Sequence, residues 1–246
     1  MKKKLLISEI VILVIIAISF IYYFNSKIPV INSPQTNQPI TESSDPQENK
    51  DIKSFVKITC SDIENISDKS VQTEVNKIIK EKIAQILASE GMGKATMVSA
   101  IPEEKDINWL EIDCTSVRSD NLIFALKFNI SSYGAGAAHP NQDTKTLNYS
   151  INDQKELGLK DLFKPDNDYL KLLSQLSRTH LKERLDERYF QMIDEGTLPQ
   201  ETNFSSFLVG KTGLTVIFNP YEVTPYSEGT QEILLKSDEM KPEYLH

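Results

Sequence analysis

The sequence is poor in the residues that build metal centres and disulfide-rich folds. Its 246 residues include only two cysteines and three histidines. A cysteine-rich zinc module or a multi-bridge disulfide scaffold needs more of them. The three histidines are far apart and form no H-x-x-x-H pair. We therefore expect no metal site and no cofactor.

Positive charge is also in the minority. Lys and Arg number 27 against 35 Asp and Glu, which gives a formal net charge of −8. Proteins that bind duplex nucleic acid draw much of their affinity from clustered Lys and Arg that neutralise phosphates. The charge balance predicts no nucleic-acid partner, whereas it suits a basic protein partner.

One long hydrophobic run stands near the N-terminus. Residues 5–24 follow three lysines and are interrupted only by Ser8, Glu9 and Ser19. Twenty helical residues span about 30 Å, the thickness of the hydrocarbon core of a bilayer. No A-x-A motif follows, so an uncleaved transmembrane signal anchor is favoured over a cleaved signal peptide. The lysines predict a cytoplasmic tip at residues 1–4, with the bulk of this single-pass chain outside the cytoplasm at the cell membrane.

The next segment has the composition of a linker. Residues 25–50 are rich in Asn, Ser, Pro, Gln and Thr. Such a segment cannot bury enough apolar surface to offset the entropy lost on ordering. We expect a disordered stalk here.

Beyond the stalk, the hydrophobic pattern predicts an α+β fold. Apolar residues at every second position predict antiparallel strands with one face in water, at 52–60, 110–116, 122–130, 147–151, 214–218 and 233–235. Helical periodicity predicts two main amphipathic helices, at 69–89 and 168–194, the second with a solvated charged face. We expect two subdomains, an N-terminal α+β one at 51–154 and a C-terminal one at 155–246.

The two cysteines have matching positions in their strands. Cys60 and Cys114 both lie on the apolar face by parity. In an exported chain such a pair can form a disulfide, and two buried free thiols are the alternative. We expect the disulfide.

Two loops contain the candidate binding residues. One runs from Tyr133 to Asn141 and contains two glycines, and the other runs from Asn219 to Gly229 and contains two prolines and two tyrosines. Both emerge at one end if their preceding strands run parallel in one sheet. Stiff loops with aromatic side chains bury contact area at low entropic cost. The predicted ligand-binding residues are Tyr133, His139, Asn141, Tyr221, Glu222, Pro225 and Tyr226. Alternatively, His139, Tyr221 and Tyr226 only hold the sheet ends together.

Four motifs in this order resemble those of an exported bacterial domain. They are Tyr133-Gly-Ala-Gly-Ala-Ala-His139-Pro140-Asn141, Leu159-Lys-Asp-Leu-Phe163, Gly213-Leu-Thr-Val-Ile-Phe218 and Tyr221-Glu-Val-Thr-Pro-Tyr226-Ser-Glu-Gly229. Over residues 52–243 the chain is similar to the domain shared by RsiV-type anti-sigma factors and the N-terminal region of PdaC-type peptidoglycan deacetylases, a family of largely unknown function. The resemblance implies a location at the cell envelope and marks residues 155–246 as RsiV-like. In RsiV-type members the domain binds lysozyme, and in PdaC-type members it accompanies a catalytic domain.

Together these features predict a membrane-anchored, sensor-like extracytoplasmic binding module and not an enzyme. Its expected ligand is a basic protein such as lysozyme, or a cell-wall glycan such as peptidoglycan. The alternative is an enzyme that acts on wall glycans through paired carboxylates, for which Glu222 and Glu228 are the loop candidates. We assign no catalytic residue, because the sequence contains no G-x-S-x-G or comparable nucleophile motif.

Overall fold

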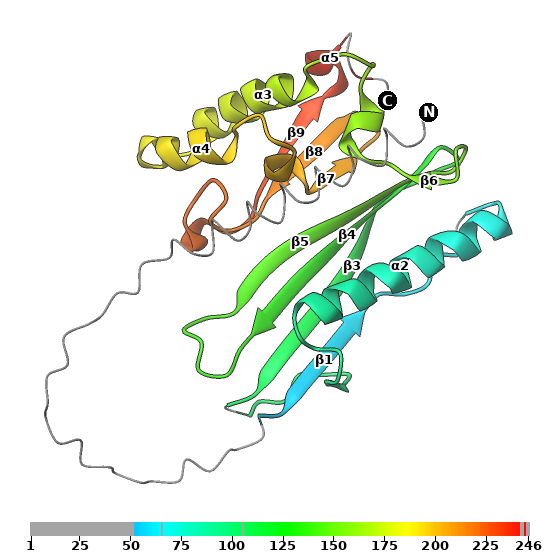
Figure 1. Cartoon of the computed structure of the whole chain (residues 1–246), viewed down its shortest axis with the longest axis vertical. Coiled ribbons are helices and arrows are strands. Elements are labelled where there is room, and N and C mark those ends of the chain that lie inside the picture. The colour runs from blue at the N-terminus through cyan, green and yellow to red at the C-terminus, as the bar shows by residue number, and fades with distance from the viewer. Residues whose placement is uncertain (1–51, 65, 105, 242–243, 245–246) are drawn as a thin grey trace, which may run out of the picture. The chain divides into compact units, whose positions relative to one another are not determined.

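The computed structural model describes residues 52–64, 66–104, 106–241 and 244. The predicted cytoplasmic tip, signal anchor and stalk lie outside the described residues. Among the helices that are described, none is long and apolar enough to cross a membrane. Lys50–His246 form one compact unit, and its α+β class agrees with the sequence prediction (Figure 1).

The first half of this unit is a six-stranded sheet in the order β2-β1-β3-β4-β5-β6. Its strands are β1 Ser54–Thr59, β2 Thr96–Met97, β3 Asn108–Ser119, β4 Ile123–Tyr133, β5 Asn141–Ser150 and β6 Lys155–Glu156. The pairs from β3 to β6 are antiparallel as predicted. However, β1 is parallel to both β2 and β3, so the all-antiparallel prediction is wrong at this edge. The reason is the helix after β1, because a helical crossover returns the chain to start the next strand in the same direction.

That helix is α2, Lys69–Ser89, with the bounds that the sequence predicted. The Asp68 carboxylate caps it by accepting hydrogen bonds from the N–H groups of Ser70 and Val71. Figure 1 shows α2 lying along one face of the sheet. Its buried side chains form a core with the sheet residues that alternate toward it. This core includes Val75, Ile79, Val56, Leu110, Ile112, Phe124, Phe128, Leu147 and Tyr149.

The second half is the antiparallel sheet β7-β8-β9 with helices packed on it. Its elements are α3 Tyr169–Arg184, α4 Phe190–Gly196, β7 Phe207–Val209, β8 Gly213–Phe218, β9 Gln231–Lys236 and α5 Ser237–Met240. Short 3-10 turns occupy Leu159–Leu162, Glu187–Tyr189, Glu201–Phe204 and Tyr226–Glu228. Leu173, Leu181, Ile193, Val216 and Phe218 belong to its separate core.

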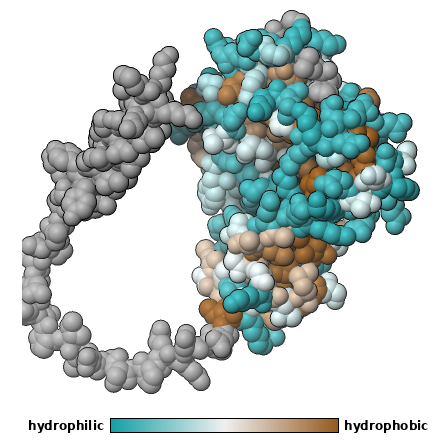
Figure 2. Space-filling view, turned by 45° about the vertical axis from the view of Figure 1, so that its right-hand side comes forward, coloured by the Kyte–Doolittle hydropathy of each residue, from teal (hydrophilic) through white to brown (hydrophobic). Residues whose placement is uncertain are grey.

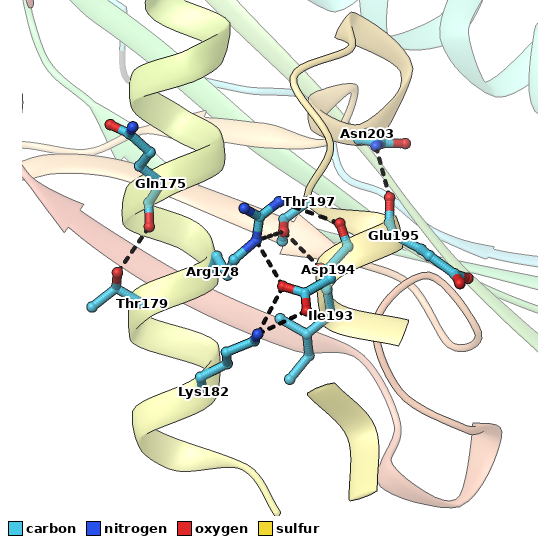
Figure 3. Close-up of polar contacts among 9 residues, drawn as sticks. All are labelled: Gln175, Arg178, Thr179, Lys182, Ile193, Asp194, Glu195, Thr197 and Asn203. Atoms are coloured by element: carbon cyan, nitrogen blue, oxygen red, sulfur yellow. Dashed lines mark hydrogen bonds and ion pairs between the residues drawn. The ribbon is translucent and has the colours of Figure 1, made fainter. Parts of the chain in front are cut away.

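The predicted helix 168–194 is two helices. Leu185 and Asp186 are extended, and the Asp186 carboxylate accepts the N–H of Arg188 to start a new turn. Part of the charged face that we expected in solvent instead forms ion pairs between the two helices. Asp194 of α4 lies between Arg178 and Lys182 of α3, at 2.9 and 2.8 Å (Figure 3).

The two sheets meet at a joint built on Asn148. This side chain is 2% exposed, and its amide donates to the carbonyl of Phe207 and accepts the N–H of Val209, both at 2.8 Å. Ser206 donates its hydroxyl to the carbonyl of Thr144 beside it. Ala125 of β4 also joins the second core. The strand face that we predicted to lie in solvent is therefore covered where the two sheets meet.

The surface of the unit that Figure 2 shows is mostly hydrophilic, and hydrophobic residues gather in its lower part. Leu122 is one of the exposed large apolar residues, although strand parity placed it on the buried face. The turn explains the difference. Asp120 accepts the N–H groups of Leu122 and Ile123, so the regular strand begins only at Ile123.

The structure joins Cys60 to Cys114 by a disulfide, with Cα atoms 4.9 Å apart. The parallel register of β1 and β3 brings them together, since Ile58 pairs with Ile112 and Thr59 with Asp113. The bond spans a sequence separation of 54 residues. It therefore ties the parallel edge of the sheet to its centre.

Loss of this bond is expected to lower stability through the unfolded chain. For a loop of this length the chain-entropy account gives roughly 4 kcal/mol. We expect the Cys60→Ser/Cys114→Ser double variant to unfold at lower urea, with up to about 4 kcal/mol less free energy of unfolding. Reductant should destabilise the native chain and leave the double variant unchanged. An equal response of both proteins would contradict the bond.

The joint makes a second prediction. Asn148→Ala leaves the carbonyl of Phe207 and the N–H of Val209 without partners, which should cost about 3 kcal/mol of unfolding free energy. Asn129→Ala is the matched control, because Asn129 lies on the same sheet face outside the joint. It should change stability by less than about 0.5 kcal/mol. Urea denaturation measures both, and equal losses would refute a special role for the joint.

Candidate functional site

The two loops nominated from the sequence lie against each other. Residues 134–140 connect β4 to β5, and residues 219–230 connect β8 to β9. The Tyr226 hydroxyl donates to the carbonyl of Pro140 at 2.7 Å, and its ring stacks on His139 with centroids 4.0 Å apart. At the base, the N–H of Thr144 donates to the Asn219 side chain at 2.8 Å. The loops meet although β4 and β8 belong to different sheets, so their meeting does not come from parallel strands in one sheet.

Tyr221 is the exposed member of this aromatic group. Its ring centroid is 5.9 Å from that of Tyr226, and the side chain is 58% exposed. Its φ of +73° lies in the left-handed region, where a bulky residue is strained. Its N–H donates to the carbonyl of Thr224, which closes a tight turn. A strained and exposed tyrosine on an ordered turn is the kind of outlier found at binding sites.

The carboxylates nominated for the enzymatic alternative both have structural partners. Glu222 accepts the N–H of Asn219 at 2.7 Å, and Glu228 accepts the hydroxyl of Tyr189 at 2.6 Å. Although the Glu222 side chain is exposed overall, protein atoms crowd its carboxylate. This burial raises the pKa of Glu222, and the negative charge of Asp143 raises it further, against the lowering effect of the Asn219 hydrogen bond.

A close packing contact supports the second loop from behind. The last residue of α4, Gly196, lies so near the backbone of Glu222 that a Cβ would come within 1.9 Å of the Glu222 carbonyl oxygen. Only glycine allows this approach. The α3–α4 pair held by Asp194 (Figure 3) thus sets the position of the loop.

The remaining predicted residues have local roles. The Tyr133 hydroxyl donates to the carbonyl of Ala137 and steadies the first loop. Asn141 is exposed and pairs with Ser132 where β5 begins. Pro225 is half-buried and precedes the 3-10 turn that contains Tyr226. All seven predicted residues therefore lie in or beside the two loops.

Sequence reasoning missed a cavity beside these loops. It has a volume of about 340 Å³ on the sheet face opposite α2, and its lining includes Glu111, Asp113, Asn129, Ser131, Gln142, Asp143 and Thr230. The available signal was the polar half of each strand's alternation, which also marks an ordinary solvated face. Cavities of about 450 and 550 Å³ elsewhere touch neither loop. Within the described ranges, no group of His, Cys, Asp and Glu could hold a metal ion.

Comparison with known proteins finds a family match in the second half of the chain. Residues 160–238 match the family model described as a protein of unknown function, DUF3298. The chain is 33% identical over 135 residues to peptidoglycan-N-acetylmuramic acid deacetylase PdaC of Bacillus subtilis (strain 168). The match covers 54% of this chain but only 29% of that protein. The resemblance to PdaC-type proteins that the motifs indicated is confirmed.

Two solved structures described as DUF3298 family proteins are similar to this chain. A DUF3298 family protein from Pseudomonas aeruginosa PAO1 has a TM-score of 0.50 at 12% identity, covering 72% of this chain and 81% of its own. A DUF3298 family member from Bacteroides fragilis NCTC 9343 has a TM-score of 0.48 at 19% identity, covering 73% and 71%. At such low identity the Pseudomonas protein supports the fold alone.

Glu222 gives a prediction with a defined pH dependence. Because its pKa is raised in the fold, its contribution to stability is present at low pH and is lost as the pH rises through the folded pKa. Glu222→Gln keeps an acceptor for the Asn219 N–H and carries no charge. The variant should melt higher than the native chain at pH 7, and the difference should vanish below about pH 4.

The control for this experiment is Glu81→Gln, at an exposed position of α2. Its melting curve should follow that of the native chain across the same pH series. A Glu222→Gln variant that is less stable than the native chain at pH 7 would contradict the prediction.

Proposed function

We propose that this chain, which carries a DUF3298 domain over residues 160–238, is a non-enzymatic binding module of the bacterial cell envelope. The observation that carries the proposal is the contact between the two loops. The Tyr226 ring and hydroxyl hold the first loop at His139 and Pro140. The contact thus presents one ordered surface built from both halves of the fold.

An ordered surface of this kind lowers the cost of binding. Pro220 and Pro225 restrict the second loop, and Gly196 packs against its backbone. Side chains that are already fixed lose little entropy when a ligand arrives. Tyr221 then supplies the exposed aromatic contact, since tyrosine buries a large area with few rotatable bonds.

The location belongs to the same proposal. Residues 5–24 anchor the chain in the membrane, and residues 25–50 carry the folded unit away from it on the extracytoplasmic side. The ligand is a cell-wall glycan or a basic protein such as lysozyme. The net charge of −8 supports a basic protein through faster association. The name of the PdaC relative supports a wall glycan.

The enzymatic alternative draws less support. The deacetylase activity in the name of the relative belongs to a protein of which this chain spans 29%. Glu222 and Glu228 each accept a hydrogen bond within the fold, from Asn219 and Tyr189. We therefore assign both carboxylates to the structure of the loop.

Retention on purified ligands tests the proposal. The full chain in detergent should be retained by insoluble peptidoglycan sacculi or by immobilised lysozyme, and elute with soluble ligand. It should release no reducing sugar from the sacculi. Failure to bind either material would overturn the proposal, and glycan hydrolysis would favour the enzymatic alternative.

Tyr221 provides a variant that separates binding from stability. Tyr221→Gly removes the strain at a φ of +73°, which should raise the free energy of unfolding by about 1 kcal/mol. The same change removes the exposed ring and should weaken ligand binding by about 2 kcal/mol. Urea denaturation and a binding titration measure the two effects. A variant that is more stable and binds equally well would exclude Tyr221 from the site.

A further inference from the structure

Two rows of polar side chains form the base of the cavity beside the loops, and we call this surface the polar floor. The strand register places Glu111, Ser131 and Gln142 in one row across β3, β4 and β5. Asp113, Asn129 and Thr144 form the next row. These six residues and Thr230 of the β8–β9 loop are in the lining. The loop that contains Tyr221 and Tyr226 thus forms a wall of the same cavity.

An aromatic pair borders this floor. Trp109 and Tyr133 are paired in the row next to Glu111 and Ser131, on the same sheet face by alternation. Their rings stack with centroids 6.0 Å apart and planes 19° apart, and both side chains remain half-buried. The face therefore places a half-exposed aromatic pair beside a row of hydroxyl and amide groups.

The charges on the floor are largely balanced. Glu111 is ion-paired with Lys57, and Asp143 with Lys145. Asp113 is the one lining carboxylate without an ion-pair or hydrogen-bond partner in the described part of the chain. A basic protein side chain would find a single free negative charge here. A neutral ligand with many hydroxyl and amide groups would instead find donors and acceptors on Asn129, Ser131 and Gln142.

We infer that this cavity and the aromatic pair in the row beside it form a subsite for a neutral glycan chain, in which one sugar ring packs on Trp109, just outside the cavity, and the polar groups of the chain bond to Asn129, Ser131 and Gln142. The inference rests on the proposed binding function and names the ligand class of that site. Sugar rings suit such a surface because their faces carry C–H groups and their edges carry hydroxyls. A volume of about 340 Å³ lies at the lower end of small-ligand sites.

The sequence supplies its own reporter for a test. Trp109 is the only tryptophan in the chain. A sugar ring that packs on it should change its fluorescence in a saturable way. The experiment titrates the full chain with the tetramer of N-acetylglucosamine, which is a neutral glycan, and follows tryptophan emission and calorimetric heat. Lysozyme is titrated separately.

Variants in the floor separate the site from the rest of the fold. Asn129→Ala and Gln142→Ala retain Trp109 and should each weaken tetramer binding about tenfold. Gln191→Ala is the control, because it removes the same amide from an exposed position of α4. It should leave the affinity unchanged. Urea denaturation of each variant verifies that the fold is intact.

Three results would overturn the inference. One is the absence of a saturable change with the tetramer, another is a change with lysozyme alone, and the third is equal weakening in Gln191→Ala. If sacculi still retain the chain in any of these cases, the proposed binding function stands and only the glycan subsite fails. If neither sacculi nor immobilised lysozyme retains the chain, the binding function itself fails.

Discussion

The arrangement of the two sheets depends on the buried amide of Asn148. A side-chain amide carries a donor and an acceptor, so one residue satisfies both the carbonyl of Phe207 and the N–H of Val209. Apolar packing alone would let the sheets slide, since it has no direction. These two bonds fix β7 on β5, and β8 and β9 follow by pairing. The loop after β8 then reaches the hairpin after β4. The candidate site continues from this joint, because Thr144 accepts the Ser206 hydroxyl in the joint and donates its N–H to Asn219 at the base of the loops.

The spacing of apolar residues predicts much of the fold, and the errors of that prediction have physical causes. The α2 segment was predictable because it is long and its cap is local, at Asp68. The break between α3 and α4 was hidden because a single helix would also place Tyr189 and Ile193 on its apolar face. Both residues are buried in the two-helix structure. Only Asp186, a good cap residue inside the charged run, signalled it. The parallel direction of β1 was hidden for another reason, since alternation is the same in either direction.

The site was predictable in part. The loops drew attention because proline, glycine and tyrosine cluster there, and these residues favour ordered turns. Their meeting was beyond the sequence, because it depends on contacts between two sheets. The polar floor was missed because alternation marks every second residue as solvated. Asn148 and Asn129 share that pattern, yet one lies in a buried joint and the other lines a cavity, while Gln142 lies outside every predicted strand.

The residues of the two loops have different structural roles. Tyr226 and His139 hold the two loops together, since the Tyr226 hydroxyl and ring are both engaged. The backbone of Tyr221 takes part in a tight turn, and its exposed ring contributes little to that turn. A left-handed bulky residue is costly, and glycine or asparagine would adopt the conformation more easily. Under the proposed function, the strained backbone at Tyr221 presents its ring to the ligand, and the neighbouring ring of Tyr226 supports it.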